Sequence, residues 1–260
     1  MNSKSVLLSL MLFVILAGCN PFGSDQPETQ VTLNVSAAAS LSDVLQGIET
    51  EFETEHPSVD VVLNLASSGT LQRQIEQGAP ADLFLSASVE KFEALRMKGL
   101  LDEEYTNQLL KNQLVLVTQK DRNVNLADLN GLTQSNIERI AIGVPASVPA
   151  GRYAKETLKN VEIWNTIENK MVYAKDVRQV LTYVETGNVD FGFVYATDAN
   201  VSNDVKIIQA IESSLHTPIV YPVGIIQNSR VKDAAISFYT FLKTEEVQAT
   251  FKDYGFSPTN

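Results

Sequence analysis

Four junctions between a loop and a predicted helix carry residue types that could bind an anion. They are residues 37–40 (AAAS), 66–70 (ASSGT), 149–152 (PAGR) and 175–177 (KDV). The first N–H groups of a helix lack an intrahelical partner, and each helix N-terminus carries about half a positive charge. Such an end is a ready site for an anion. Four ends directed into one cleft would supply roughly two positive charges, enough for a dianion without any lysine or arginine.

Each junction by itself also has an ordinary structural explanation. A serine-rich turn is more often a helix cap, and Ser40 with Asp43 fits a capping-box variant, S-x-x-D. Tyr195, at the end of an apolar strand, is more often a core residue than a ligand. The joint occurrence of four junctions, two in each half of the chain, is what favours a binding site.

Motifs of enzymes are absent from the sequence. It has no G-x-S-x-G, no H-E-x-x-H, no C-x-x-C and no phosphate-binding P-loop. Asp190-Phe191-Gly192 spells the magnesium motif of kinases, but the other kinase motifs do not accompany it. We therefore expect neither an enzyme nor a cofactor. An extracellular hydrolase assembled from distant residues stays open as an alternative of another class.

Composition and charge narrow the class of partner. The chain of 260 residues is 44% hydrophobic and 20% charged, which is ordinary globular usage. A formal charge of −11 argues against nucleic acid, whose phosphates attract basic surfaces. One cysteine, Cys19, excludes a disulfide framework and a cysteine zinc site. Two histidines argue against a histidine-rich metal centre.

The N-terminus has the features of a lipoprotein signal. Lys4 precedes an apolar run, residues 6–16, that is short for a bilayer crossing. The run ends in LAGC (16–19), which resembles the bacterial lipobox, so we predict a signal peptide over residues 1–18 and a lipid on Cys19. An uncleaved anchor helix is the alternative. Residues 19–30 are polar and predict a flexible tether. We expect a protein held by lipid at the extracytoplasmic face of the cell membrane.

Strands and helices alternate from residue 31 onward. Period-two and continuous apolar runs predict strands, and apolar residues at helical spacing predict helices. The strands are expected at 31–36, 59–65, 82–86, 114–118, 139–143, 189–195 and 219–226. This alternation predicts an α/β protein with mostly parallel sheets. We expect two lobes, one formed by residues 31–112 and 224–260 and the other by residues 113–223.

Several segments together resemble one family of proteins. They are AAASL (37–41), ASSGTL (66–71), GAPADLF (78–84), VPAGRYAKE (148–156), KDVRQVL (175–181), YPV (221–223) and YGF (254–256). In this order and spacing they resemble the molybdate-binding proteins of bacterial ABC importers, the ModA family. The resemblance implies a type II periplasmic-binding-protein fold with the ligand cleft between its lobes. It also implies delivery of the ligand to the transmembrane subunits of an ABC permease, by a protein that acts as a monomer.

The resemblance also implies a ligand set made only of uncharged donors. Ser40 and Ser68 would each give a hydroxyl and an N–H, and the metal would be reached only through the oxygens of the anion. The remaining donors would be the N–H groups of Ala150 and Val177 and the hydroxyl of Tyr195. Gly69 stands where some relatives would carry a serine. Arg152 and Arg178 lie beside the loops and are expected to matter less than these five residues.

A shell of donors selects a fully deprotonated tetraoxyanion. Phosphate carries a proton at neutral pH, and that O–H would find no acceptor. Sulfate has the right charge but shorter bonds, so we expect molybdate and tungstate as ligands. A receptor for sulfate or another tetrahedral oxyanion is the alternative within the class, as is a tungstate receptor that uses carboxylates. A sensor or adhesin on the same fold is a further possibility.

Overall fold

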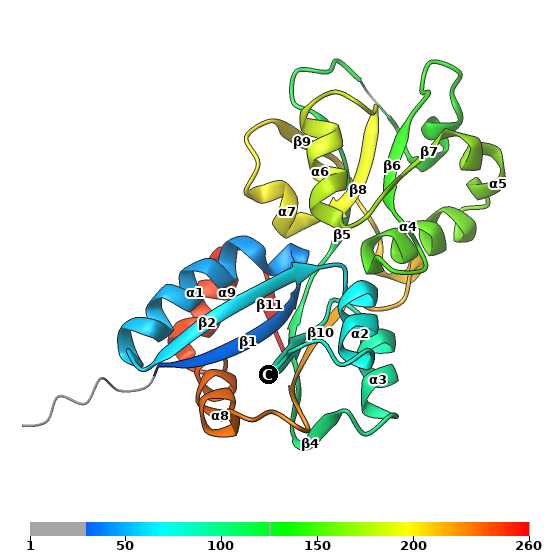
Figure 1. Cartoon of the computed structure of the whole chain (residues 1–260). Coiled ribbons are helices and arrows are strands. Elements are labelled where there is room, and N and C mark those ends of the chain that lie inside the picture. Colours follow the sequence, from blue (N-terminus) through cyan, green and yellow to red (C-terminus); the bar gives the residue numbers. More distant parts are fainter. Residues whose placement is uncertain (1–29, 125, 260) are drawn as a thin grey trace, which may run out of the picture.

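The computed structural model describes residues 30–124 and 126–259. The predicted signal peptide, Cys19 and the tether up to residue 29 lie outside the described residues. Two sheets with helices packed on them form two lobes (Figure 1). None of the helices within the described ranges has the length and apolar character needed to cross a bilayer.

The first lobe is built on a sheet of strand order β11-β4-β10-β3-β1-β2. Its strands are β1 (Val31–Ala38), β2 (Val59–Ala66), β3 (Leu83–Leu85), β4 (Leu101–Lys111), β10 (Val220–Ile226) and β11 (Ser257–Pro258). Its helices are η1 (Ala39–Leu41), α1 (Ser42–Glu55), α2 (Ser68–Glu76), α3 (Val89–Arg96), α8 (Lys232–Phe241) and α9 (Glu245–Asp253). Strands β2, β1 and β3 run parallel, and η1 and α2 begin where β1 and β2 end.

The second lobe has a sheet of order β7-β6-β8-β5-β9. Its strands are β5 (Leu114–Gln119), β6 (Ile140–Gly143), β7 (Met171–Ala174), β8 (Phe191–Tyr195) and β9 (Val205–Ala210). Its helices are α4 (Pro149–Asn160), α5 (Trp164–Ile167), α6 (Val177–Glu185) and α7 (Ala196–Asn200), with short 3-10 turns at Leu129–Thr133, Glu168–Lys170 and Ser213–Leu215. Each of β6, β7 and β8 is followed by the helix that starts at the cleft end of its strand.

The α/β class with two lobes is confirmed, and most strands of each sheet run in the same direction. Strand β10 runs antiparallel to β3 and β4, and β5 runs antiparallel to β8 and β9. Both sheets are therefore mixed. The apolar run LVLVT (114–118) is buried, as expected. Hydropathy indicates that a strand is covered on both faces, but it does not indicate the direction in which the strand runs.

The chain crosses between the lobes twice. It leaves the first sheet at Asn112 and Gln113, between β4 and β5, and returns between β9 and β10. The two crossing segments lie side by side, since the N–H of Asn112 donates to the carbonyl of Ile219 at 3.3 Å. All of β10 pairs within the first sheet, so the expected boundary between residues 223 and 224 falls inside this strand.

Periodic apolar residues explain the helices that carry the cleft. Helix α6 buries Val177, Val180, Leu181 and Val184, which form one helical stripe. The carboxylate of Asp176 accepts the N–H of Gln179 at 2.8 Å, so Asp176 caps α6 as predicted. In α4, Pro149 occupies the first turn, where its missing N–H costs no hydrogen bond. These local signals place both helix N-termini at the cleft.

Candidate anion-binding site

All five predicted site residues line one small cavity between the lobes. The first lobe contributes Ser40 and Ser68, and the second contributes Ala150, Val177 and Tyr195. The volume of this cavity is about 10 Å³, roughly the space that one water molecule needs. This conformation therefore leaves no room for a sugar or an amino acid. The role of these residues as ligands stays a prediction.

Helix N-termini supply the backbone donors of this cavity. Ser68 is the first residue of α2, Val177 is the first of α6, and Ala150 is the second of α4. N–H groups at these positions have no carbonyl four residues earlier in the helix to bond with. The helix dipoles add a partial positive charge at the same ends. The cavity thus has the polarity of an anion site.

Ser40 does not cap a helix, so the predicted capping box is wrong. It lies inside η1, and α1 begins at Ser42 with no side-chain cap. Instead, its Oγ lies 2.9 Å from the Oη of Tyr221, which also accepts a hydrogen bond from the amide of Asn112 at 3.3 Å. Either hydroxyl of this pair can donate. When Tyr221 donates, the hydroxyl proton of Ser40 is free to point into the cavity.

The hydroxyl of Ser68 also forms a hydrogen bond with a second residue of the first lobe. Its Oγ accepts the N–H of Ala87 at 2.9 Å, and the side chain is fully buried. A hydroxyl has one proton to donate. Because the hydrogen bond from Ala87 uses a lone pair of Ser68, that proton remains available for a ligand.

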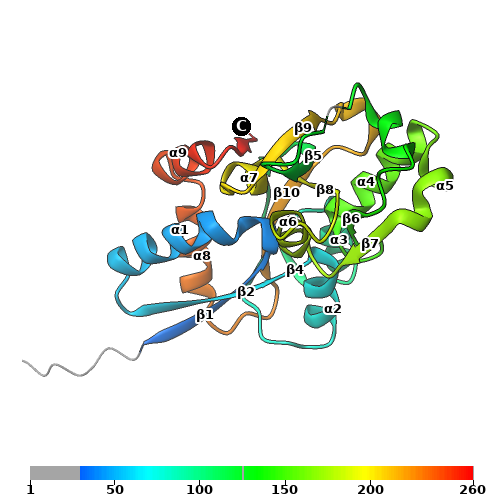
Figure 2. The same cartoon turned by 90° about the horizontal axis from the view of Figure 1, so that it is seen from above.

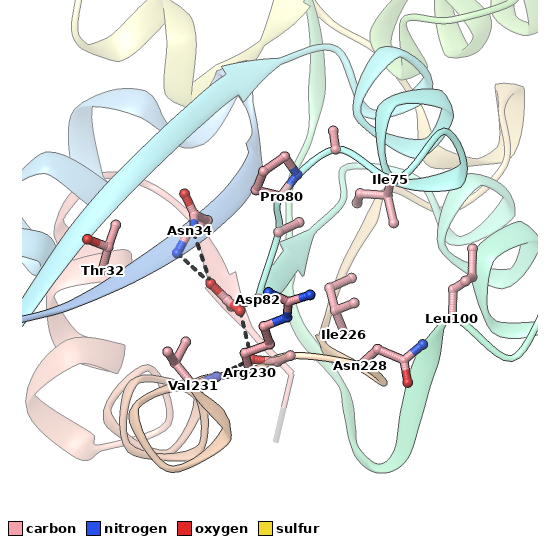
Figure 3. A pocket seen from close by; sticks show the side chains of 14 residues that line it. Thr32, Asn34, Ile75, Pro80, Asp82, Leu100, Ile226, Asn228, Arg230 and Val231 are labelled. Carbon is pink, nitrogen blue, oxygen red and sulfur yellow. Dashed lines mark hydrogen bonds between the residues drawn. The ribbon is translucent and has the colours of Figure 1, made fainter.

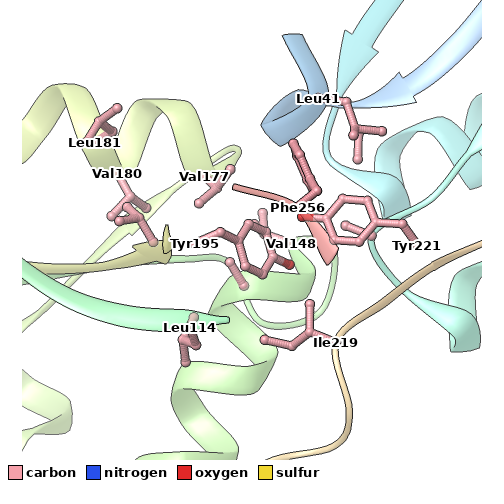
Figure 4. Close-up of a cluster of buried hydrophobic side chains, with 14 of the residues drawn as sticks. Leu41, Leu114, Val148, Val177, Val180, Leu181, Tyr195, Ile219, Tyr221 and Phe256 are labelled. Carbon is pink, nitrogen blue, oxygen red and sulfur yellow. The ribbon is translucent and has the colours of Figure 1, made fainter. Parts of the chain in front are cut away.

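The hydroxyl of Tyr195 is a buried donor without a protein partner in the described chain. Its ring packs edge-on against that of Tyr221, with centroids 5.9 Å apart, among the apolar side chains where the lobes meet (Figure 4). Burial raises the pKa of Tyr195 well above its ordinary value, so the hydroxyl keeps its proton. A buried polar atom without a partner is costly, which indicates that a ligand completes it.

No lysine, arginine or histidine side chain lines the cavity in the part of the chain that the structure describes. Arg178 lies nearby, but its guanidinium is engaged by Asp43 at 2.9 Å and by Asp198 at 3.5 Å. Nor do residues 30–124 and 126–259 hold any group of three or more histidine, cysteine, aspartate or glutamate side chains placed to bind a metal ion. The donors that face the cavity are therefore uncharged.

Comparison with known proteins decides the family. A family model described as bacterial extracellular solute-binding protein matches residues 33–257. The molybdate-binding protein ModA of Escherichia coli is 40% identical over 233 residues, which cover 86% of this chain and 88% of the relative. The chain belongs to the ModA family of bacterial extracellular solute-binding proteins.

Two further relatives extend the comparison to this solute-binding protein. YvgL of Bacillus subtilis, named provisionally as an ABC transporter substrate-binding lipoprotein, is 43% identical over 252 residues and 96% of both chains. The solved periplasmic molybdate-binding protein of Azotobacter vinelandii superposes with a TM-score of 0.79 at 23% identity, covering 88% of this chain and all of that one. This second likeness confirms the two-lobe fold expected from the sequence.

Gly69 allows the two lobes of the solute-binding protein to approach closely. Its N–H donates across the cleft to the carbonyl of Ser147 at 2.9 Å. A Cβ added at Gly69 would lie 2.7 Å from that carbonyl oxygen and 2.8 Å from the Cα of Ser147. The absence of a side chain at residue 69 is therefore a condition of this closed arrangement. The hydroxyl of Tyr153 makes a second contact across the cleft, to the carbonyl of Ala87 at 3.2 Å.

A larger cavity, about 510 Å³, lies toward the opposite end of β1 (Figure 3). Its wall includes the buried carboxylate of Asp82, which accepts the N–H of Asn34 at 2.8 Å and the hydroxyl of Ser229 at 2.7 Å. These bonds tie β1 to the loop after β10. Size alone does not mark the site of this solute-binding protein, and a carboxylate lines each cavity, Asp82 here and Asp176, the cap of α6, in the smaller one.

Tyr221 and Ala87 are the functional neighbours that sequence reasoning missed. Tyr221 belongs to the YPV segment, but nothing in the local spacing links it to Ser40, which is 181 residues away. Ala87 acts through its backbone N–H, which its residue type does not reveal. Both positions depend on the packing of distant elements.

Proposed function

We propose that this solute-binding protein captures molybdate or tungstate between its lobes and delivers the anion to the membrane subunits of an ABC importer. The observation that carries the proposal is the buried hydroxyl of Tyr195, which lacks a protein partner in the described chain and lies in a small cavity between the lobes. Uncharged donors from both lobes surround the same space. The molybdate-binding relative from Escherichia coli supports the choice of ligand.

Five residues are proposed to hold the anion. Ser40 and Ser68 donate through hydroxyl and backbone N–H, Ala150 and Val177 through N–H, and Tyr195 through its hydroxyl. Since both lobes contribute donors, the anion bridges them and favours the closed form. The support for this assignment is that helix starts and oriented hydroxyls converge on the cavity.

The chemistry of the shell predicts selectivity. Every proposed ligand group donates, so an anion that keeps a proton loses a hydrogen bond and leaves its own O–H unpaired. Phosphate at neutral pH should therefore bind weakly. Sulfate is fully deprotonated but smaller, and a rigid shell would hold it loosely. Molybdate and tungstate are nearly the same size and should bind alike.

The remaining parts of the proposal concern the oligomeric state of the protein, its lack of catalytic activity and its membrane anchor. We infer a monomer that acts without catalysis and is anchored through a lipid on Cys19. The lipobox-like LAGC and the lipoprotein named among the relatives support the anchor. The family description supports an extracellular transport role and gives no reason to expect turnover.

Thermal unfolding of the soluble domain, from about residue 30 onward, tests the ligand. The protein is heated with molybdate, tungstate, sulfate and phosphate at equal concentrations. A ligand at 1,000 times its dissociation constant stabilises the folded state by about 4 kcal/mol. We expect a clear rise in Tm with molybdate and tungstate and little change with the other two. No shift with any of the four anions would contradict the proposal.

Substitutions test the residue assignment by calorimetric titration with molybdate. Ser40→Ala, Ser68→Ala and Tyr195→Phe should each weaken binding by about 1.5–3 kcal/mol, the range for hydrogen bonds to a charged group. Tyr239→Phe, in α8 of the first lobe and outside the cavity, is the matched control and should leave affinity unchanged. Unchanged affinity in all three site variants would overturn the assignment.

A further inference from the structure

Arg178 joins the two lobes through an ion pair beside the cavity. It follows Val177 in α6 of the second lobe, and α6 lies next to η1 and the start of α1 (Figure 2). Its Nη1 lies 2.9 Å from Oδ2 of Asp43, and its Nη2 donates to Oδ1 of Asp43 at 3.4 Å. Asp43 belongs to the first turn of α1, in the other lobe. The two terminal nitrogens of the guanidinium, Nη1 and Nη2, thus face one carboxylate across the cleft.

A second carboxylate holds the arginine from within its own lobe. Oδ1 of Asp198 lies 3.5 Å from Nη1 of Arg178, and the Asp198 side chain is fully buried. Oδ2 of Asp198 accepts the backbone N–H of Tyr195 at 3.1 Å. Asp198 therefore places a carboxyl beside the guanidinium, at the strand end that carries a proposed ligand. Because Asp198 and Arg178 belong to the same lobe, this contact does not cross the cleft.

The bridge connects elements that carry proposed ligands in both lobes. Asp43 lies three residues after Ser40, and Arg178 directly follows Val177. Neither Asp43 nor Arg178 lines the cavity. A change in the ion pair would act on the approach of the lobes and leave the donor set in place. A guanidinium that already faces two carboxylates is also a poor direct partner for a ligand carboxylate.

We propose that Arg178, preset by Asp198, is a positioning residue that closes onto Asp43 and thereby slows release of the bound anion. The inference rests on the proposed function and adds a determinant of ligand residence time. It does not require contact between Arg178 and the anion. Most differences in affinity between related complexes arise in the dissociation rate, which is where a closure contact acts.

A second arginine offers an internal comparison. Arg152 in α4 pairs with Glu156 of its own lobe at 2.9 Å and lies 3.5 Å from Glu90 of the first lobe. Glu90 is more exposed than Asp43 and pairs with Lys91 at 2.8 Å. An ion pair contributes less as its groups become more exposed to solvent. Arg178 should therefore govern closure more strongly than Arg152.

The test is a stopped-flow measurement of molybdate dissociation at physiological ionic strength. Asp43→Asn keeps the shape of the side chain and leaves the pair of Arg178 with Asp198 intact. We expect it to speed dissociation about 3- to 10-fold, somewhat above the effect of an exposed ion pair, with little change in association. Asp102→Asn is the control, because it removes one negative charge and an ion pair with Lys232 within the first lobe. It should dissociate at the wild-type rate.

A double-mutant cycle separates the bridge from a general charge effect. Arg178→Gln should also speed dissociation, and the double variant with Asp43→Asn should be no faster than Arg178→Gln alone. An unchanged rate in Asp43→Asn, or an equal change in Asp102→Asn, would overturn the inference while the proposed function stood. If the wild-type protein binds no oxyanion, the proposed function fails, and the inference that rests on it fails with it.

Discussion

At the scale of single residues, the serine hydroxyl groups of this cavity are oriented by hydrogen bonds to neighbouring residues. Ser40 and Ser68 each have their oxygen engaged by a second residue, Tyr221 for the first and Ala87 for the second. With Tyr221 as the donor to Ser40, each serine keeps one proton for the proposed ligand. Orientation before binding reduces the entropy lost on binding, which raises affinity without any added charge.

Tyr221→Phe should weaken molybdate binding although Tyr221 is not a proposed ligand. The change removes the partner that orients Ser40, and a neutral hydrogen bond contributes about 0.5–1.5 kcal/mol. Titration calorimetry should show a loss in that range, smaller than the loss in Ser40→Ala. Wild-type affinity in Tyr221→Phe would mean that Ser40 needs no support from behind.

Asp198 should impose a pH dependence on stability. Burial, opposed by the positive charge of Arg178, raises the pKa of Asp198 to about 7. The same carboxyl in an unfolded chain loses its proton near pH 4. Between about pH 4 and 7 the folded state therefore holds a proton that the unfolded state lacks. The contribution of this group to the free energy of unfolding falls as pH rises through that window, by at most ~1.4 kcal/mol per pH unit.

Asp198→Asn tests this sign, because an amide has no proton to lose. Urea denaturation at pH 5 and pH 8 should show that the wild-type protein loses more stability than the variant on going to the higher pH. Asp43 and Arg178 are the nearby charged groups, and both stay in place in the variant. Equal losses in the two proteins would contradict the assignment of the raised pKa.

At the scale of the elements, the N–H groups at a helix N-terminus can bind an anion only if the first turn of the helix is fixed, and a capping side chain fixes it. Helix α6 presents Val177 to the cavity, and Asp176 fixes its first turn through the N–H of Gln179. Asp176→Ala should lower the free energy of unfolding by about 0.5–2 kcal/mol. It should also weaken molybdate binding, because the N–H of Val177 loses its fixed position.

Asp176→Asn provides the matched control for that prediction. Asparagine caps a helix about as well as aspartate but carries no charge. Denaturation and titration should show near wild-type stability and affinity for this variant. A loss as large as that of Asp176→Ala would show that the charge of Asp176, and not the cap, stabilises the helix start.

At the scale of the whole molecule, closure requires that two backbones meet at Gly69 and Ser147. Gly69→Ala adds a Cβ that would collide with the backbone of the opposite lobe. Opening of the cleft would separate these backbones and remove the collision, and alanine favours a helix over glycine by about 1 kcal/mol. We expect at least about tenfold weaker molybdate binding with no loss of stability in the ligand-free protein.

Gly47→Ala is the matched control for closure. Gly47 lies within α1, and no atom lies within 4 Å of a Cβ added there. Calorimetry should show unchanged affinity, and denaturation should show the small gain typical of glycine-to-alanine changes in helices. Wild-type affinity in Gly69→Ala would mean that the lobes need not approach this closely for binding.

Local sequence signals were sufficient for much of the fold. Apolar spacing predicted α1, α6 and the buried run of β5, and Asp176 was predicted as a cap, because these features depend on neighbours within one or two turns. Strand β4 was not predicted, since it carries acidic and polar residues and is largely exposed. The five proposed ligands were named from small residues at helix starts and from the family resemblance.

Only the tertiary structure decided how these pieces face one another. The sheets are mixed, Ser40 bonds to Tyr221, and Arg178 bridges to Asp43 and Asp198. Ser40 and Tyr221 are 181 residues apart, and Arg178 and Asp43 are 135 apart. Periodicity and capping report interactions between residues close in the chain, and hydropathy reports burial alone. Strand direction and contacts across the cleft arise from packing between distant elements, so no local pattern could predict them.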